Sequence, residues 1–105
     1  MKKSLIGIAA ASALILAGNV QADPAALAQS SGCLNCHQVD TKLVGPGLTE
    51  IAAKYAGEEG AAEMLAGKIK NGSNGVWGQI PMPPNPAVSD ENALVLAEFI
   101  LSLNN

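Results

Sequence analysis

Residues Gly32 to His37 read GCLNCH, and this stretch contains both cysteines and the only histidine of the 105-residue chain. Two residues separate Cys33 from Cys36, and His37 follows directly. Cysteine pairs at this spacing occur in redox disulfides, in zinc sites and at the attachment point of c-type haem. The rest of the sequence has to decide between these uses.

The first two uses lack the sequence context that they require. A thioredoxin-like C-x-x-C needs a strand–helix–strand unit, and this chain has no alternating strand pattern. Structural zinc takes four ligands, commonly from two separated pairs, and there is no second Cys/His pair. A plain disulfide across two residues would close a tight loop and contribute little.

The complete pattern C-x-x-C-H is the attachment signature of c-type haem. In that chemistry two thiols add to the two vinyl groups of haem, and the histidine that follows directs a ring nitrogen at the iron. We therefore predict one haem c per chain, bound covalently through Cys33 and Cys36, with His37 as a metal ligand.

The first 22 residues have the layout of a secretory signal. Two lysines near the start are followed by an almost wholly apolar run over residues 5–17, and Val20-Gln21-Ala22 ends in a small residue suited to a signal peptidase. The run is shorter than the ~20 residues of a comfortable membrane span, so an uncleaved anchor is the weaker alternative. We expect cleavage after Ala22, one domain over residues 23–105, and export to the periplasm.

The domain that remains is small, acidic and poor in aromatic residues. It has four lysines, no arginine and nine carboxylates, which gives a formal charge of −5 and argues against nucleic acid as a partner. One Trp, one Tyr and one Phe supply little bulk for a core. Chains this short often need a disulfide, a metal or another cross-link to be stable. A haem would fill the centre of such a core.

Local signals divide the domain into four short helices and one long loop. Asp23-Pro24 and Ser89-Asp90 are typical helix starts. Residues 71–88 contain four prolines and three glycines, a density that excludes helix and ladder strand. We expect one helix from residue 24 to just before the cysteines and three more over residues 48–55, 60–70 and 90–103. The last helix should face the core with Leu96, Phe99, Ile100 and Leu103.

Met82, in the loop sequence GQIPMPPNP, is predicted to be the second axial ligand of the iron. Prolines on both sides stiffen the backbone and would hold the sulfur in place. Met64 lies at core spacing on a predicted helix and is interpreted as a packing residue, and Met1 leaves with the signal. The alternative for Met82 is a turn residue packed on the core.

These motifs together resemble those of a known family. The chain carries DP at the start of the domain, then GCLNCH, DTKLVGPGL, KIKNGSNGVWGQIPMPPN and VSDENA. Over essentially the whole of residues 23–105 it resembles a bacterial class I c-type cytochrome of the small monohaem cytochrome c-551 type. The resemblance implies an all-α class I cytochrome c fold, with four short helices and a long Met-bearing loop packed around one covalent haem.

The resemblance also implies roles for four further residues. Pro46 corresponds to a proline whose carbonyl accepts a hydrogen bond from the axial histidine, and Trp77 to an indole that hydrogen-bonds a haem propionate. Asn85 corresponds to an amide that touches the methionine ligand. On their own these would be a turn proline, a core filler and a turn residue. Lys68 stands where close relatives often have an arginine that holds a propionate; lysine lacks the fork geometry, so a solvated helix face is an equal alternative.

A haem with His and Met ligands has no open position for a substrate, so we predict that the protein is not an enzyme. The predicted function is a soluble periplasmic single-electron carrier between a quinol-oxidising complex or another cytochrome and a terminal reductase or oxidase. By resemblance, the acceptor is nitrite reductase or cytochrome oxidase. The alternatives are a peroxidase-like or ligand-sensing protein in which Met82 is displaced, and a thiol oxidoreductase that uses Cys33 and Cys36.

The expected partners are redox proteins that dock transiently at the exposed haem edge. We expect a monomer, with no nucleic acid and no stable membrane insertion after signal cleavage. The formal charge of −5 predicts positive or neutral docking surfaces on the partners. A locally basic patch is the alternative, and four lysines are available for it: Lys42, Lys54, Lys68 and Lys70.

Overall fold

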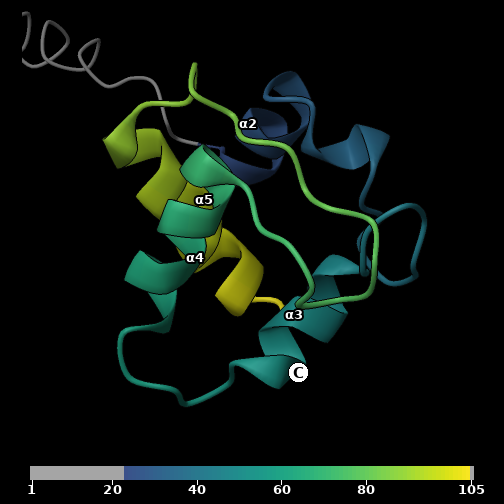
Figure 1. The fold of residues 1–105 in the computed structure, drawn as a ribbon. Coiled ribbons are helices and arrows are strands. Elements are labelled where there is room, and N and C mark those ends of the chain that lie inside the picture. Colours follow the sequence, from purple (N-terminus) through teal and green to yellow (C-terminus); the bar gives the residue numbers. More distant parts are fainter. Residues whose placement is uncertain (1–22, 105) are drawn as a thin grey trace, which may run out of the picture.

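The computed structural model describes residues 23–104, and the predicted signal and its cleavage site lie outside this range. Four α-helices and one 3-10 turn form the described part, without a named strand, as predicted (Figure 1). The elements are α2 (Pro24–Ser30), the 3-10 turn η2 (Cys33–Asn35), α3 (Leu48–Lys54), α4 (Ala61–Asn71) and α5 (Asp90–Leu101).

Helices α2 and α5 begin where the sequence provides a side-chain N-cap. The Asp23 carboxylate accepts hydrogen bonds from the backbone N–H groups of Ala25 and Ala26, at 3.1 and 3.2 Å. The Ser89 hydroxyl accepts one from the N–H of Asn92 at 3.0 Å. Both side chains satisfy N–H groups that have no partner within the helix. The predicted ends differ by one or two residues; α4 starts at Ala61 because Gly60 is left-handed, with φ 79°.

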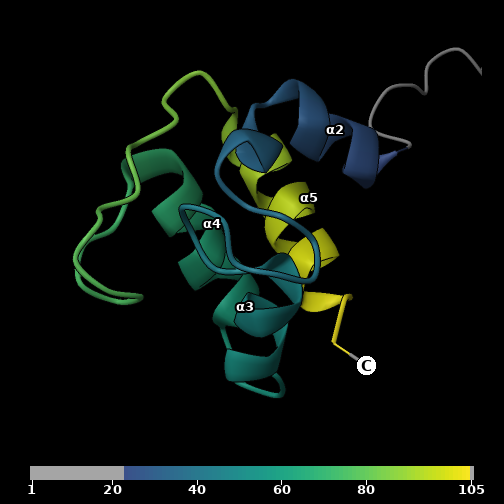
Figure 2. The ribbon, with the colours of Figure 1, turned by 90° about the vertical axis from the view of Figure 1, so that its right-hand side faces the viewer.

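The core is small and lies where α5 packs against the other three helices (Figure 2). Leu96 is the largest side chain that is fully buried. Phe99, Ile100 and Leu103, predicted to share its stripe, are only partly buried and pack at the edge of the core. The buried cluster contains Ala28, Leu48, Ile51, Leu65, Ile69, Ala93, Leu96 and Ala97.

The long loop leaves the end of α4, extends toward α3 and returns to the start of α5 (Figures 1 and 2). Its two limbs meet in an isolated antiparallel bridge, in which Ser73 N donates to Met82 O at 3.1 Å and Met82 N donates to Ser73 O at 2.9 Å. The backbone N–H of Asn85 donates to the carbonyls of Ile69 and Lys70, each at 3.1 Å. The second limb is therefore fixed to the C-terminal end of α4.

Candidate functional site

A largely apolar cleft brings together most of the residues that the sequence singles out. Its walls come from the η2 turn and the segment after it, from α3 and α4, and from the long loop. Among the described residues that line it there are two lysines and no carboxylate. The predicted site residues in its lining are Cys33, Cys36, His37, Pro46, Lys68, Trp77 and Met82.

The η2 turn sets the positions of the two cysteines. Cys33 O accepts hydrogen bonds from the N–H groups of Cys36 at 3.3 Å and His37 at 3.0 Å, which closes a tight helical turn. Both cysteines are half-buried and no disulfide joins them. Burial raises the pKa of the Cys33 thiol, whereas reactive redox cysteines have lowered pKa values. The turn thus presents both sulfur atoms to the same cleft.

His37 is oriented by a hydrogen bond to the next loop. Its Nδ1 lies 2.7 Å from the carbonyl oxygen of Pro46, which is buried. A carbonyl only accepts, so Nδ1 must carry the proton and Nε2 keeps a free lone pair. A metal-binding histidine needs this tautomer, and the bond from Nδ1–H fixes the orientation of the ring.

Gly45 gives the His37 ring room to adopt this position. A Cβ atom at residue 45 would lie 2.7 Å from Cε1 and 3.0 Å from Nδ1 of His37. The backbone of residues 44 and 45 is held there because Cys36 O accepts from both of their N–H groups, at 3.1 and 2.8 Å. Gly45 could not be identified from the sequence, because nothing local in VGPG indicates contact with a ring eight residues earlier.

The two methionines of the described chain have different surroundings. Met82 lines the cleft, and its backbone is fixed by the bridge to Ser73. Both side chains pack against the buried cluster, but Met64 is not among the residues that line the cleft. This arrangement agrees with the interpretation of Met64 as a packing residue and leaves Met82 as the thioether available to the cleft.

Three other predicted residues lie at or near the cleft. Trp77 is 38% exposed and Lys68 projects from α4, and both are lining residues. The Asn85 amide nitrogen donates to the carbonyl of Ile69 at 3.0 Å and to that of Pro83 at 3.5 Å. These bonds use the two amide hydrogens, so a contact with the Met82 sulfur would require the weaker one to be exchanged; that contact remains a prediction.

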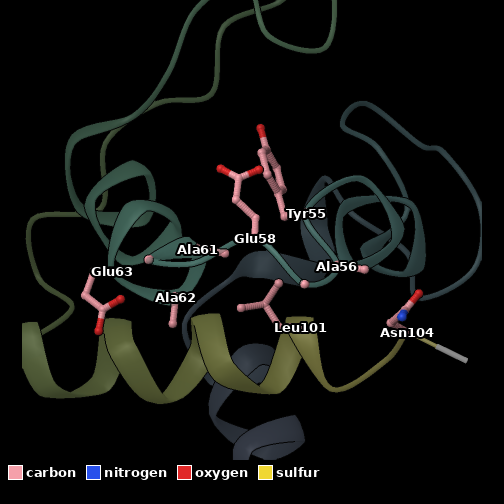
Figure 3. Close-up of a pocket in the computed structure, with 10 residues that line it drawn as sticks. Tyr55, Ala56, Glu58, Ala61, Ala62, Glu63, Leu101 and Asn104 are labelled. Carbon is pink, nitrogen blue, oxygen red and sulfur yellow. The ribbon is translucent and has the colours of Figure 1, made fainter.

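A second cavity, of about 320 Å³, lies between the α3–α4 turn and the C-terminal end of α5 (Figure 3). Glu58 and Glu63 contribute to its wall, and Tyr55 lines both this cavity and the cleft. Within the described part of the chain its lining has no cysteine, histidine or methionine. It therefore has none of the side chains that attach or ligate a haem.

Two features of residues 23–104 bear on the alternatives. No three side chains of the His, Cys, Asp or Glu type converge as a metal site would require, so the zinc alternative has no ligand set there. Within the same range, every helix is too short or too polar to cross a membrane.

Comparison with known proteins identifies the family. The Cytochrome c family model matches residues 22–104. The chain belongs to the cytochrome c family. Cytochrome c-552 of Nitrosomonas europaea is 61% identical to this cytochrome, over 98% of this chain and 99% of the relative. Cytochrome c-551 of Stutzerimonas stutzeri is 58% identical over the same shares. The crystal structure of wild-type N. europaea cytochrome c552 superimposes with a TM-score of 0.75 at 62% identity, covering 76% of this chain and 99% of that one.

These matches confirm the small class I cytochrome of the c-551 type, its fold and its covalent haem c. The residues of the cleft fit that cofactor: two thiols on one turn, an imidazole with Nε2 free, a thioether, and apolar side chains from α3 and α4. Haem c uses both thiols as thioethers, which excludes the thiol oxidoreductase. As a cytochrome c, the protein transfers electrons and is not an enzyme.

Proposed function

We propose that His37 and Met82 ligate the haem iron and that this cytochrome is a periplasmic single-electron carrier. The supporting observation is that His37, with its Nε2 free, and Met82 line the same cleft as the two attachment cysteines. Six-coordinate iron has no position left for a substrate. The carrier would take electrons from a quinol-oxidising complex or another cytochrome and pass them to a terminal reductase or oxidase.

The cleft favours a high reduction potential in this proposal. A thioether is a soft ligand that stabilises ferrous iron. The apolar walls from Leu48, Ile51 and Leu65 disfavour the additional charge of ferric iron in the same direction. We also propose that Trp77 and Lys68, which line the cleft, contact haem propionates, and that Asn85 tunes the iron through the Met82 loop.

The visible spectrum and a redox titration of the purified protein test the ligation. Methionine ligation predicts a weak red charge-transfer band in the ferric form, from sulfur to iron. It also predicts that carbon monoxide does not bind the ferrous form readily, because the sixth position is filled. Ready binding would favour the sensor or peroxidase-like alternative. That alternative usually needs distal polar groups, and this chain has no second histidine and no arginine to supply them.

We further propose that the protein is a monomer and that its partners dock transiently at the mouth of the cleft. Exposed apolar side chains gather there, with Ile80 67% exposed and Val44 46% exposed. Lys42 and Lys68 line the same cleft, and none of the nine carboxylates does. The local surface is therefore apolar with a basic edge, although residues 23–105 carry a formal charge of −5.

The dependence of the electron-transfer rate on ionic strength distinguishes the effect of the local charge at the cleft from that of the overall charge. Screening over about 10 Å at 0.1 M salt leaves the charges nearest the contact as the ones that act. Electron-transfer rates with an acidic redox partner should therefore fall as salt is raised at moderate ionic strength. A rate that rises with salt would mean that the overall charge governs docking and would contradict the basic edge.

Export is part of the same proposal. The tripartite layout of residues 1–22 supports a cleaved secretory signal, and the match of the family from residue 22 onward supports a domain that begins close to the proposed cleavage site. N-terminal sequencing of the haem protein recovered from the periplasm should read DPAAL. Recovery of a chain that retains the apolar run would contradict cleavage after Ala22.

A further inference from the structure

Residues 74–81 form the part of the long loop that faces solvent. All eight are exposed, and within the described chain none of them makes a backbone or side-chain hydrogen bond. The bridge between Ser73 and Met82 closes the base of this segment and leaves its tip free of such bonds. Seven of the eight residues, Gly75 to Pro81, nevertheless line the haem cleft on one side.

One side-chain contact reaches this segment from a rigid element. The Lys54 ammonium lies 5.6 Å from the centroid of the Trp77 ring and 5.6 Å from that of the Tyr55 ring. Ammonium groups within about 6 Å of an aromatic face are attracted by the ring quadrupole. Lys54 therefore contacts the indole of Trp77 on the loop and, at the same time, the phenol of Tyr55, the C-cap residue of α3.

The packing of α3 fixes the position of Lys54 in this contact. Leu48, Ile51 and Ala52 bury one side of the helix in the core. Lys54 is the last residue of α3, where a positive charge also interacts favourably with the helix dipole. The position of the ammonium is thus set by a packed helix, whereas no other polar group of residues 23–104 anchors the segment that carries Trp77.

We propose that Lys54 is a positioning residue that holds Trp77, and with it residues 74–81, against the haem cleft. In the closed loop the indole remains in the wall of the cleft and limits the access of solvent to it. Without the ammonium the loop opens more often. An exposed cation–π contact of this kind changes the open-loop population by about two- to five-fold.

Trp77 is the only tryptophan of the chain, so its fluorescence reports the loop directly. In the haem-bound protein a nearby haem quenches indole emission by energy transfer, and the residual signal comes from open conformations. The comparison uses three variants. Lys54→Gln removes the charge, Lys54→Arg keeps a cation that stacks on aromatic rings, and Lys70→Gln removes a charge that instead pairs with Asp90 on α5.

We expect Lys54→Gln to raise the Trp77 emission about two- to five-fold, and Lys54→Arg and Lys70→Gln to retain the quenched signal. Unchanged emission in Lys54→Gln, or an equal rise in Lys70→Gln, would overturn the proposal. The haem absorption spectrum of each variant establishes that the cofactor is bound. The readout needs bound haem c but no particular axial ligand, so it succeeds or fails independently of Met82.

Discussion

The backbone of Gly45 lies against the imidazole ring of His37, so closely that a methyl group at residue 45 would come within 2.7 Å of Cε1. The ring is held between this backbone and the carbonyl of Pro46, which accepts the Nδ1 proton at 2.7 Å. Two neighbouring loop residues therefore fix both the plane and the tautomer of the histidine.

Gly45→Ala should destabilise the folded haem protein by about 1–3 kcal/mol, the usual cost of overpacking a well-packed site. The added methyl would displace the ring and lengthen its bond to Pro46. Denaturant unfolding, followed by far-UV circular dichroism, measures the loss. Gly67→Ala is the matched control, because a Cβ there meets nothing within 4 Å and alanine suits the interior of α4; it should gain about 0.5–1 kcal/mol. Equal stability of the two variants would contradict the close packing at Gly45.

Met82→Ala should lower the reduction potential by an amount on the order of 0.1 V, because the soft ligand that favours ferrous iron is lost. The opened iron site should then bind carbon monoxide or imidazole readily. Redox titration and absorption spectra measure both effects. Met64→Ala is the control, since Met64 packs on the core outside the cleft and should change stability but not the ligand spectrum. An unchanged spectrum in Met82→Ala would refute Met82 as a ligand.

The sequence allowed the helices and the haem turn to be predicted because their signals are local. Asp23 and Ser89 cap the helices that follow them, and Cys33, Cys36 and His37 lie within five residues. The fourth helix was expected to extend to Leu103 because its apolar stripe continues, but α5 ends at Leu101. The stripe is only partly buried there, so packing does not sustain the last turn.

What the sequence could not show are contacts between residues that are distant in the chain. The bridge of Ser73 with Met82, the packing of Gly45 on His37 and the approach of Lys54 to Trp77 each depend on how loops return to the helices. No residue pattern encodes these distances. The roles suggested for Pro46 and Trp77 came from a family resemblance rather than from their own spacing.

The pair Lys70–Asp90 predicts a dependence of stability on pH. The Lys70 ammonium, 2.7 Å away, lowers the pKa of the Asp90 carboxyl, first by a hydrogen bond and then by its charge. Because the folded pKa lies below the unfolded value of about 4, the stabilisation is complete above that value. It is lost as the pH falls through the lowered pKa.

The Tm difference between wild type and Asp90→Asn should therefore be largest near neutral pH and should shrink in acid. It should also shrink in high salt, because the carboxyl is fully exposed and its charge is screened. A double-mutant cycle with Lys70→Gln isolates the pair from the interaction of Asp90 with the α5 dipole. A Tm difference that stays constant across this pH range would show that the pair contributes nothing.

Gly72→Ala should weaken both the fold and the Met82 ligand. Gly72 has φ 81° and ψ 178°, a region that is essentially restricted to glycine, and a Cβ there would lie 2.5 Å from the Met82 carbonyl oxygen. The backbone strain alone costs about 1–3 kcal/mol, and the clash would push Met82 away from its bridge to Ser73.

Gly57→Ala separates these two effects. Gly57 has φ 74°, but a Cβ there meets nothing within 4 Å, and the residue lies outside the cleft. Both variants should lose stability in denaturant unfolding, because alanine is strained at positive φ. Only Gly72→Ala should also weaken the red charge-transfer band and lower the potential, because only there does the added methyl reach the ligand loop. If the two variants have the same spectrum, the backbone next to Ser73 does not position the methionine sulfur.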